Sequence, residues 1–264
     1  MTMIKFDRFQ NGAKKIVTFS YDDGRVFDRR LVDIFNTYGL KATFHLNSGF
    51  LHRDTCIDPA EIKTLYAGHE VAAHGKIHAS QNMVSTQNIV YDVLEDKRAL
   101  EELCGYPVRG FSYPNGYCCA DYGKVMESLG IEYSRTINST GKFGLPYNFL
   151  MWNPTCHHRD NGVAKATQFV KQVPNATLFY MWGHSYEFDT NNNWEVIEEI
   201  AKVISGHDDY WYATNIEIVD YIKAQHNLKM TYDNKVIYNP SAREVWFSLD
   251  GQTLSVKGGE TLYL

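Results

Sequence analysis

TFSYDDG, at residues 18–24, ends the apolar run IVTFSYD (16–22) with two adjacent carboxylates and a glycine. The β-branched and aromatic residues of this run predict a buried strand. Burying two unpaired carboxylates side by side is costly because both lose water and repel each other, and a cation removes that cost. Adjacent strand residues point to opposite sides, so Asp22 and Asp23 can serve different roles. A solvated Asp-Asp-Gly turn is the alternative interpretation of this segment taken alone.

Outward from this segment, short apolar runs alternate with segments of helical period. We expect further strands at 42–47, 69–74, 108–114, 131–137, 148–154, 177–184 and 211–213. Helices are expected at 26–38, 59–67, 86–103, 120–129, 162–173, 193–205 and 214–225. This alternation predicts an α/β fold with a parallel sheet of about seven or eight strands, buried on both faces.

The sequence pattern changes after about residue 228, where short segments of alternating apolar and polar residues are separated by glycine turns. The pattern predicts a small antiparallel β appendage. We therefore divide the chain into a barrel domain, 1–227, and a β-rich C-terminal appendage, 228–264, packed on the barrel. Capping the barrel is the preferred role of the appendage, and sugar binding or dimerisation are the alternatives.

Composition narrows the classes of function. The chain has 264 residues, 44% of them hydrophobic, and a net charge of −5, which argues against a nucleic-acid partner. No apolar run is long enough for a membrane span or a signal peptide, so we expect no membrane partner and a cytoplasmic location. The five cysteines lack CxxC spacing, which argues against a disulfide framework or a structural zinc site. A homo-oligomer remains open.

Three further segments place polar residues where expected strands end. HGKIH (74–78) has two histidines four residues apart, a spacing that lets both reach one metal ion from one side of a helical turn. FSYPNG (111–116) ends in a turn, and MWGHSYEF (181–188) carries His184 at the end of an apolar run. Strand ends of a parallel barrel meet at one rim, so these residues are expected to converge with Asp22 and Asp23 in an active site.

These four segments, in this order, resemble the polysaccharide deacetylases of carbohydrate esterase family four, which include chitin and peptidoglycan deacetylases. The resemblance covers roughly residues 14–220. It implies a distorted (β/α) barrel of about seven strands and one divalent metal ion. Zinc is the first choice for that ion, with cobalt, nickel, manganese or iron as others. The implied partner is an acetylated oligo- or polysaccharide substrate.

The resemblance also implies roles for individual residues. Asp22 corresponds to the general base and His184 to the general acid. The metal ligands are Asp23, His74 and His78. An Asp-His-His set leaves coordination positions open for water and a carbonyl oxygen, as a catalytic site requires. The turn at Tyr113 and Pro114 is expected to contact substrate, with the backbone N–H of Tyr113 or a neighbour holding the oxyanion.

The sequence departs from the family pattern at two motifs. Where most relatives have an arginine that orients the base, this chain has Ser112, and Arg135 is the preferred substitute over Arg109. The motif that supports the catalytic histidine is not recognisable. WNPTCHH (152–158) stands in its place, with Trp152 expected to line the acetyl pocket.

Some residues near these motifs keep two interpretations. His157 and His158 are read as a loop feature, with substrate or metal binding as the alternative. Tyr186 and Glu187 are read as loop packing, with contact to substrate hydroxyls as the alternative.

The sequence thus predicts a metal-dependent hydrolase that removes N- or O-linked acetyl groups from a carbohydrate. Two alternatives stay open: a cyclic amide or imide hydrolase on the same barrel, and a non-catalytic carbohydrate-binding protein.

Overall fold

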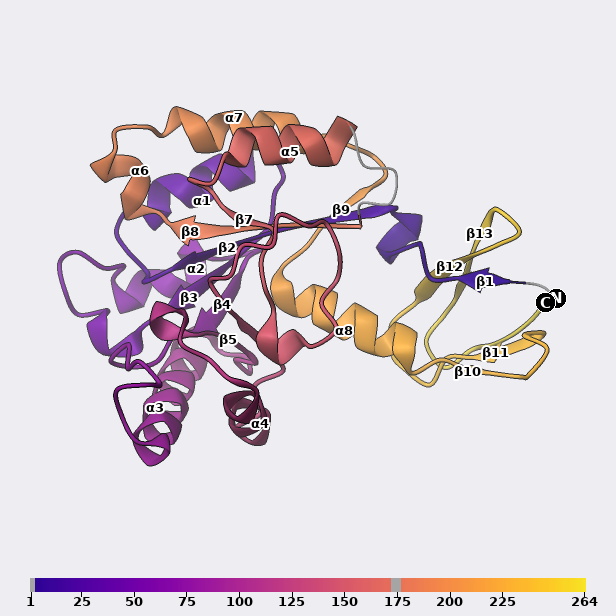
Figure 1. Ribbon diagram of the computed structural model, residues 1–264, viewed down its shortest axis with the longest axis horizontal. Helices are drawn as coiled ribbons and strands as arrows, with labels where there is room; N and C mark the ends of the chain where they lie inside the picture. The colour runs from indigo at the N-terminus through magenta and orange to yellow at the C-terminus, as the bar shows by residue number, and fades with distance from the viewer. Residues whose placement is uncertain (1–2, 172–176) are drawn as a thin grey trace.

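The computed structural model describes residues 3–171 and 177–264. Its main sheet is parallel and has the strand order β6-β5-β4-β3-β2-β8-β7 (Figure 1). The strands are β2 (Lys15–Asp22), β3 (Ala42–Leu46), β4 (Glu70–Ala73), β5 (Gly110–Ser112), β6 (Tyr133–Arg135), β7 (Cys156–His157) and β8 (Leu178–His184). A short eighth strand, β9 (Tyr210–Tyr212), pairs with the first residues of β2.

The two edges of this sheet approach each other through the segment 152–158. The N–H of Trp152 donates to Ser134 O of β6 at 2.9 Å, whereas the N–H of Thr155 donates to Tyr180 O of β8 at 2.8 Å. One segment therefore connects β6, at one edge of the sheet, with β8, which lies next to the other edge strand β7. The sheet curls into a distorted (β/α) barrel, which confirms the predicted fold class.

Helices cover the outside of the curled sheet. They are α1 (Asp28–Thr37), α2 (Ile62–Leu65), α3 (Thr86–Cys104), α4 (Ala120–Ser128), α5 (Gly162–Lys171), α6 (Tyr186–Thr190), α7 (Glu195–Ile204) and α8 (Asn215–His226). Helices α1, α5 and α7 lie on one side of β2 and β8, and α3 and α4 lie on the other (Figure 1). None of the helices within the described ranges is long and apolar enough to cross a membrane.

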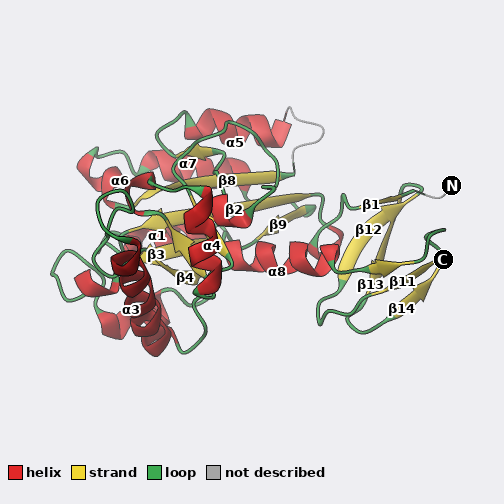
Figure 2. Cartoon of the chain, turned by 60° about the horizontal axis from the view of Figure 1, so that its bottom comes forward, coloured by secondary structure: helices red, strands yellow, loops and turns green. Residues whose placement is uncertain are grey.

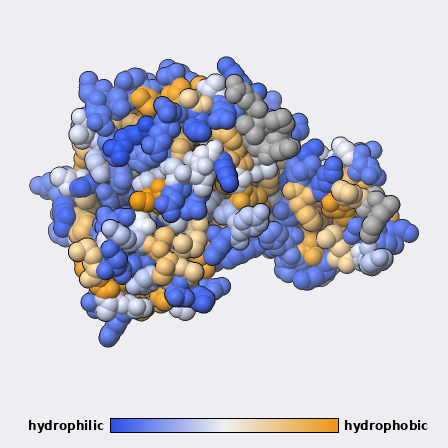
Figure 3. All heavy atoms as spheres, viewed as in Figure 1, coloured by the Kyte–Doolittle hydropathy of each residue, from blue (hydrophilic) through white to orange (hydrophobic). Residues whose placement is uncertain are grey.

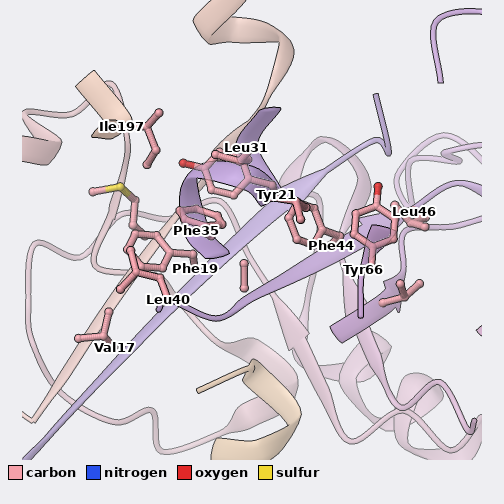
Figure 4. Packing of buried hydrophobic residues seen from close by; sticks show 14 of the residues in the cluster. Val17, Phe19, Tyr21, Leu31, Phe35, Leu40, Phe44, Leu46, Tyr66 and Ile197 are labelled. Atoms are coloured by element: carbon pink, nitrogen blue, oxygen red, sulfur yellow. The ribbon is translucent and has the colours of Figure 1, made fainter. Parts of the chain in front are cut away.

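Strand β2 shows why the site forms inside the barrel. Its outward side chains Phe19 and Tyr21 pack against Phe35 of α1, with ring centroids 4.9 and 5.8 Å away (Figure 4). The alternate side chains, among them Ser20 and Asp22, face the barrel interior and are buried. The main apolar core thus lies between sheet and helices. The interior holds a second apolar cluster, which includes Ile16, Trp152 and Tyr180, and polar groups such as Asp22 where β2 ends.

The appendage consists of two three-stranded antiparallel sheets, with the orders β1-β12-β13 and β10-β11-β14. Their strands are β1 (Ile4–Lys5), β10 (Lys229–Met230), β11 (Val236–Tyr238), β12 (Val245–Leu249), β13 (Gln252–Val256) and β14 (Thr261–Tyr263). The appendage lies beyond the end of α8, joined to the barrel by a narrow waist (Figures 2 and 3). The strands β2 and β8 point away from it (Figure 1). The appendage is therefore remote from the rim where those strands end.

The domain boundary at residues 227 and 228 remains a prediction. It assigns the N-terminal strand β1 to the barrel domain, although β1 lies in a sheet of the appendage. Strand β1 pairs with β12, so Ile4–Lys5 lies in the appendage sheet. Asp220 of α8 accepts from Arg109 of the barrel at 2.8 Å and from Arg243 of the appendage at 2.7 Å. These contacts fasten the appendage to the base of the barrel.

Two expected elements differ in the structure. Residues 148–154 do not form a strand, because the Asn148 side chain accepts from Leu150 N at 2.9 Å and starts a short 3-10 turn, Phe149–Met151. Only Trp152 keeps a bridge, to Arg135. The helix expected at 162–173 is observed as α5 to Lys171, and its last two expected residues lie outside the described residues.

Candidate active site

Asp22 is the last residue of β2, and its carboxylate is 2% exposed. The Arg135 guanidinium contacts Oδ2, and Ser112 Oγ donates to Oδ1 at 3.3 Å. Nδ1 of His45 lies 3.4 Å from the same Oδ1. Burial alone would raise the pKa of Asp22, but the positive charge of Arg135 holds it well below its usual range. Asp22 is therefore ionised at neutral pH.

Arg135 ends β6 and is fully buried. Its guanidinium lies 4.2 Å from the centroid of the Trp182 ring, which fixes the plane of the group. Arg109, the other arginine considered, forms two hydrogen bonds with Asp220, at 2.8 and 2.9 Å. Of these two arginines, only Arg135 contacts Asp22. Ser112 and Arg135 are paired in register on β5 and β6, so the arginine comes from the neighbouring strand.

Asp23, His74 and His78 lie together at the rim, with one potential ligand atom from each within 4.8 Å of the others. Asp23 has a φ of 80°, which turns its carboxylate away from the direction of the strand. The expected helical turn over residues 74–78 is wrong. His78 has a φ of 57° and belongs to a loop, so the two histidines converge through a left-handed backbone instead of helical spacing.

The tautomer of His74 decides whether it can bind a metal. Its Nδ1 lies 2.8 Å from the carbonyl oxygen of Ser112, and a carbonyl oxygen can only accept. Nδ1 also lies 2.6 Å from Ser112 Oγ, which donates its own proton to Asp22 Oδ1 and so accepts from Nδ1. Nδ1 therefore carries the proton, and Nε2 presents a lone pair. Nε2 lies 3.8 Å from both Asp22 Oδ2 and Asp23 Oδ1. Burial lowers the pKa of His74 to about 4, so the ring is neutral at pH 7 and ready to act as a ligand.

His184, at the end of β8, lies beside a second cluster built around Glu187 of α6. Oε2 of Glu187 lies 3.1 Å from both His157 Nε2 and His158 Nε2, and 3.6 Å from His184 Nδ1. Burial would raise the pKa of Glu187, but the three histidines hold it far below its usual range. Burial lowers the pKa of His184, but Glu187, Asp22 and Asp23 outweigh burial and raise it above its ordinary value. His184 is therefore suited to carry a proton near neutral pH.

His157, His184 and Glu187 also have the spacing of a metal site. The backbone N–H of Arg159 donates to His157 Nδ1 at 3.1 Å, and an N–H can only donate. Nδ1 therefore lacks a proton, and Nε2 of the neutral ring must carry one, directed toward Glu187. A protonated nitrogen is no metal ligand. We interpret this cluster as an electrostatic support for His184, centred on the Glu187 carboxylate.

Glu187 was read as loop packing in the sequence. Its position three residues after His184 was the only available signal, because α6 turns it back toward β8.

The structure corrects three expectations about substrate contacts. Trp152 is completely buried against Tyr133 and Tyr180, so it cannot line a pocket open to substrate. The N–H of Tyr113 donates to Arg135 O at 3.0 Å within the sheet and is not free to hold an oxyanion. Pro114, which has no N–H, is buried beside it. Trp182, 8% exposed, is the tryptophan near the site.

Residues 9–134 match the family model for polysaccharide deacetylase. This part of the chain is similar to the polysaccharide deacetylase family. The match includes the segments with Asp22, Asp23, His74 and His78, and ends just before Arg135. No protein with a curated description matches the chain.

Solved structures of this family share the fold. A candidate polysaccharide deacetylase from Mycobacterium smegmatis is 16% identical, with a TM-score of 0.62 over 83% of this chain and 93% of that one. A family 4 acetyl xylan esterase from Clostridium thermocellum, in complex with a cobalt ion, is 18% identical, with a TM-score of 0.52 over 79% and 92%.

A third relative has lost its activity. This family 4 pseudoenzyme from Bacillus anthracis is 14% identical, with a TM-score of 0.53 over 78% of this chain and 65% of that one. At these identities the likeness establishes the carbohydrate esterase family 4 deacetylase fold. Activity has to be argued from the residues of the site.

Proposed function

We propose that this protein is a metal-dependent hydrolase that removes acetyl groups from a carbohydrate. The observation that carries the proposal is the convergence at one rim of three ligand side chains, Asp23, His74 and His78, beside the ionised carboxylate of Asp22. One structural relative is a pseudoenzyme, so a non-catalytic protein is the alternative that the proposal has to exclude. The complete set of reactive groups in this chain favours an enzyme.

The donor set fits a divalent ion. His74 offers a free lone pair on Nε2, and one carboxylate with two imidazoles leaves further coordination positions open. Zinc is the ion we propose first, and the cobalt-bound esterase of Clostridium thermocellum supports testing cobalt beside it. When bound, such an ion polarises the acetyl carbonyl and lowers the pKa of a water molecule.

The chain's own residues then handle the protons. Asp22 accepts the proton of the attacking water, and Arg135 and Ser112 hold its carboxylate toward the rim. His184 donates a proton to the departing amine or alcohol, and the Glu187 carboxylate, 3.6 Å from Nδ1, stabilises the protonated ring before that transfer. Trp182 lies between Arg135 and His184, with its ring 5.7 Å from the His184 ring, and forms an apolar wall suited to the acetyl methyl group.

The test is metal-dependent acetate release. Metal-stripped protein is incubated with N-acetyl-chitooligosaccharides and, separately, with acetylated xylan oligomers, before and after addition of zinc or cobalt. We expect release from at least one substrate only after metal addition, and the substrate cleaved distinguishes amide from ester chemistry.

Metal content is measured on the same samples. One bound ion with no acetate released from either substrate would contradict the deacetylase proposal and favour a cyclic amide as substrate. Absence of ion binding would favour the non-catalytic alternative.

A further inference from the structure

The loop that carries both histidine ligands has an unusual backbone. Gly75 has a φ of 80° and His78 a φ of 57°, both in the left-handed region. A histidine in this region is strained, and such a conformation persists only when the surrounding structure holds it. The groups that hold this loop thus decide whether His74 and His78 face the same point.

Two buried carboxylates of α3 bind the backbone of this loop. Oδ2 of Asp96 accepts from His74 N at 2.9 Å, and Oδ1 of Asp92 accepts from Ile77 N at 2.8 Å. Asp92 and Asp96 are one helical turn apart on the same face of α3, and they are 4% and 0% exposed. Neither forms a salt bridge with a described residue. The hydrogen bonds that these two carboxylates accept from the loop come from backbone N–H groups.

The same loop is held from its other side. Asn47, which follows β3, donates from Nδ2 to the carbonyl oxygens of His74, at 2.9 Å, and Gly75, at 2.6 Å. Asp96 also accepts from Ser48 N at 2.7 Å, so it ties the β3 and β4 loops together. A Cβ on Gly75 would collide with Asp92 Oδ2, which shows how closely this carboxylate approaches the loop.

We propose that Asp92 and Asp96 are positioning residues that preorganise His74 and His78 for the metal ion. This inference rests on the proposed function and goes beyond it, because it assigns part of the metal affinity to a helix that contributes no ligand. Losing an outer hydrogen-bond partner of a ligand weakens metal binding by about 10- to 100-fold.

The hydrogen bonds of Asp92 and Asp96 predict a different loss of zinc affinity for each substitution. Asp92→Asn keeps an acceptor oxygen for Ile77 N and is expected to bind metal nearly normally, whereas Asp92→Ala is expected to bind about 10- to 100-fold more weakly. Asp96 uses both oxygens, so Asp96→Asn would place an amide N–H against a backbone N–H and is expected to weaken binding strongly. Gly75→Ala disturbs the same contact from the loop side.

The experiment measures zinc affinity of the full chain by calorimetry, the absorption spectrum of the cobalt-loaded protein and the thermal midpoint of the metal-free protein. Leu100→Ala is the control for destabilisation, because Leu100 is a fully buried apolar residue of the same helix and has no side-chain hydrogen-bonding group. Glu102→Gln is the control for charge, because Glu102 is exposed on the same helix and bonded to Arg98. Both controls should keep the unaltered affinity and cobalt spectrum.

The outcomes separate this inference from the proposed function. If the unaltered protein binds zinc and Asp92→Ala and Gly75→Ala bind it equally well, the positioning role is wrong and the proposed function stands. Equal losses in Asp92→Asn and Asp92→Ala would show a charge effect and overturn the hydrogen-bond role. If the unaltered protein binds neither zinc nor cobalt, the proposed function and this inference fail together.

Discussion

Two clusters of histidine and carboxylate lie at the same rim, and their chemistry differs although their composition is alike. In the first, Nδ1 of His74 donates to the Ser112 carbonyl oxygen, which leaves Nε2 free for a metal ion. In the second, Nδ1 of His157 accepts from Arg159 N, which leaves Nε2 protonated and 3.1 Å from Glu187 Oε2. The partners of Nδ1 in each ring thus separate a candidate metal site from an electrostatic support.

The sharpest way to break this comparison is to remove one histidine from each cluster. His78→Ala removes a proposed ligand and should weaken zinc binding by more than about 100-fold, beyond the effect of losing an outer hydrogen-bond partner. Activity should be lost with it. His157→Ala should leave zinc affinity unchanged. Calorimetry on both variants checks the prediction, and a loss of zinc in His157→Ala instead would reverse the two assignments.

Asp22→Asn should separate metal binding from turnover. The amide cannot accept the proton of water, so we expect kcat to fall by about 10²- to 10⁴-fold, the usual contribution of a general base. The zinc content should stay at one ion per chain, because Asp22 is not among the three proposed ligands. Near-normal kcat would show that another group is the base.

Glu187→Gln tests the support cluster through a pH profile. The acid must be protonated, so activity is lost as the pH rises through the pKa of His184. Glu187 raises that pKa, so its removal lowers the pKa and moves the alkaline limb of the profile to lower pH. We also expect kcat to fall by about 10- to 100-fold, less than loss of the whole acid.

Glu187→Asp is the matched variant, since it keeps the charge at a shorter reach. It should restore part of the alkaline limb. If Glu187→Gln lowers the stability of the protein but leaves the pH profile of activity unchanged, the role of Glu187 is structural only.

The smallest effect is expected at Ser112. Ser112→Ala removes the donor to Asp22 Oδ1 but keeps the carbonyl oxygen that orients His74. One hydrogen bond contributes roughly 0.5–1.5 kcal/mol, so kcat should fall by about 2- to 10-fold with unchanged zinc affinity. A loss of zinc here would show that the hydroxyl, and not the carbonyl, sets the tautomer of His74.

The barrel and the rim that carries the candidate site could be predicted from the sequence, because both depend on patterns of neighbouring residues. Strand β2 is recognisable because the six residues 16–21, mostly apolar or β-branched, precede the two carboxylates, and the strand ends of a parallel barrel meet at one rim. The prediction failed at 148–154, where Asn148 bonds its own backbone and replaces the strand with a turn. It also failed at Trp152, because an apolar pattern does not tell a ring in the core from a ring lining a pocket.

The order of strands and helices, the pair Asp22 and Asp23 and the two histidines of HGKIH are properties of the sequence by itself, since each depends on neighbouring residues. The tertiary structure alone decided which nitrogen of His74 is free, which carboxylate lies beside His184, and that α3 holds the loop with the proposed ligands His74 and His78. These features depend on hydrogen bonds between residues such as His74 and Ser112, 38 positions apart, or His74 and Asp96, 22 positions apart. Only folding brings such partners together, so no local pattern in the chain could reveal them.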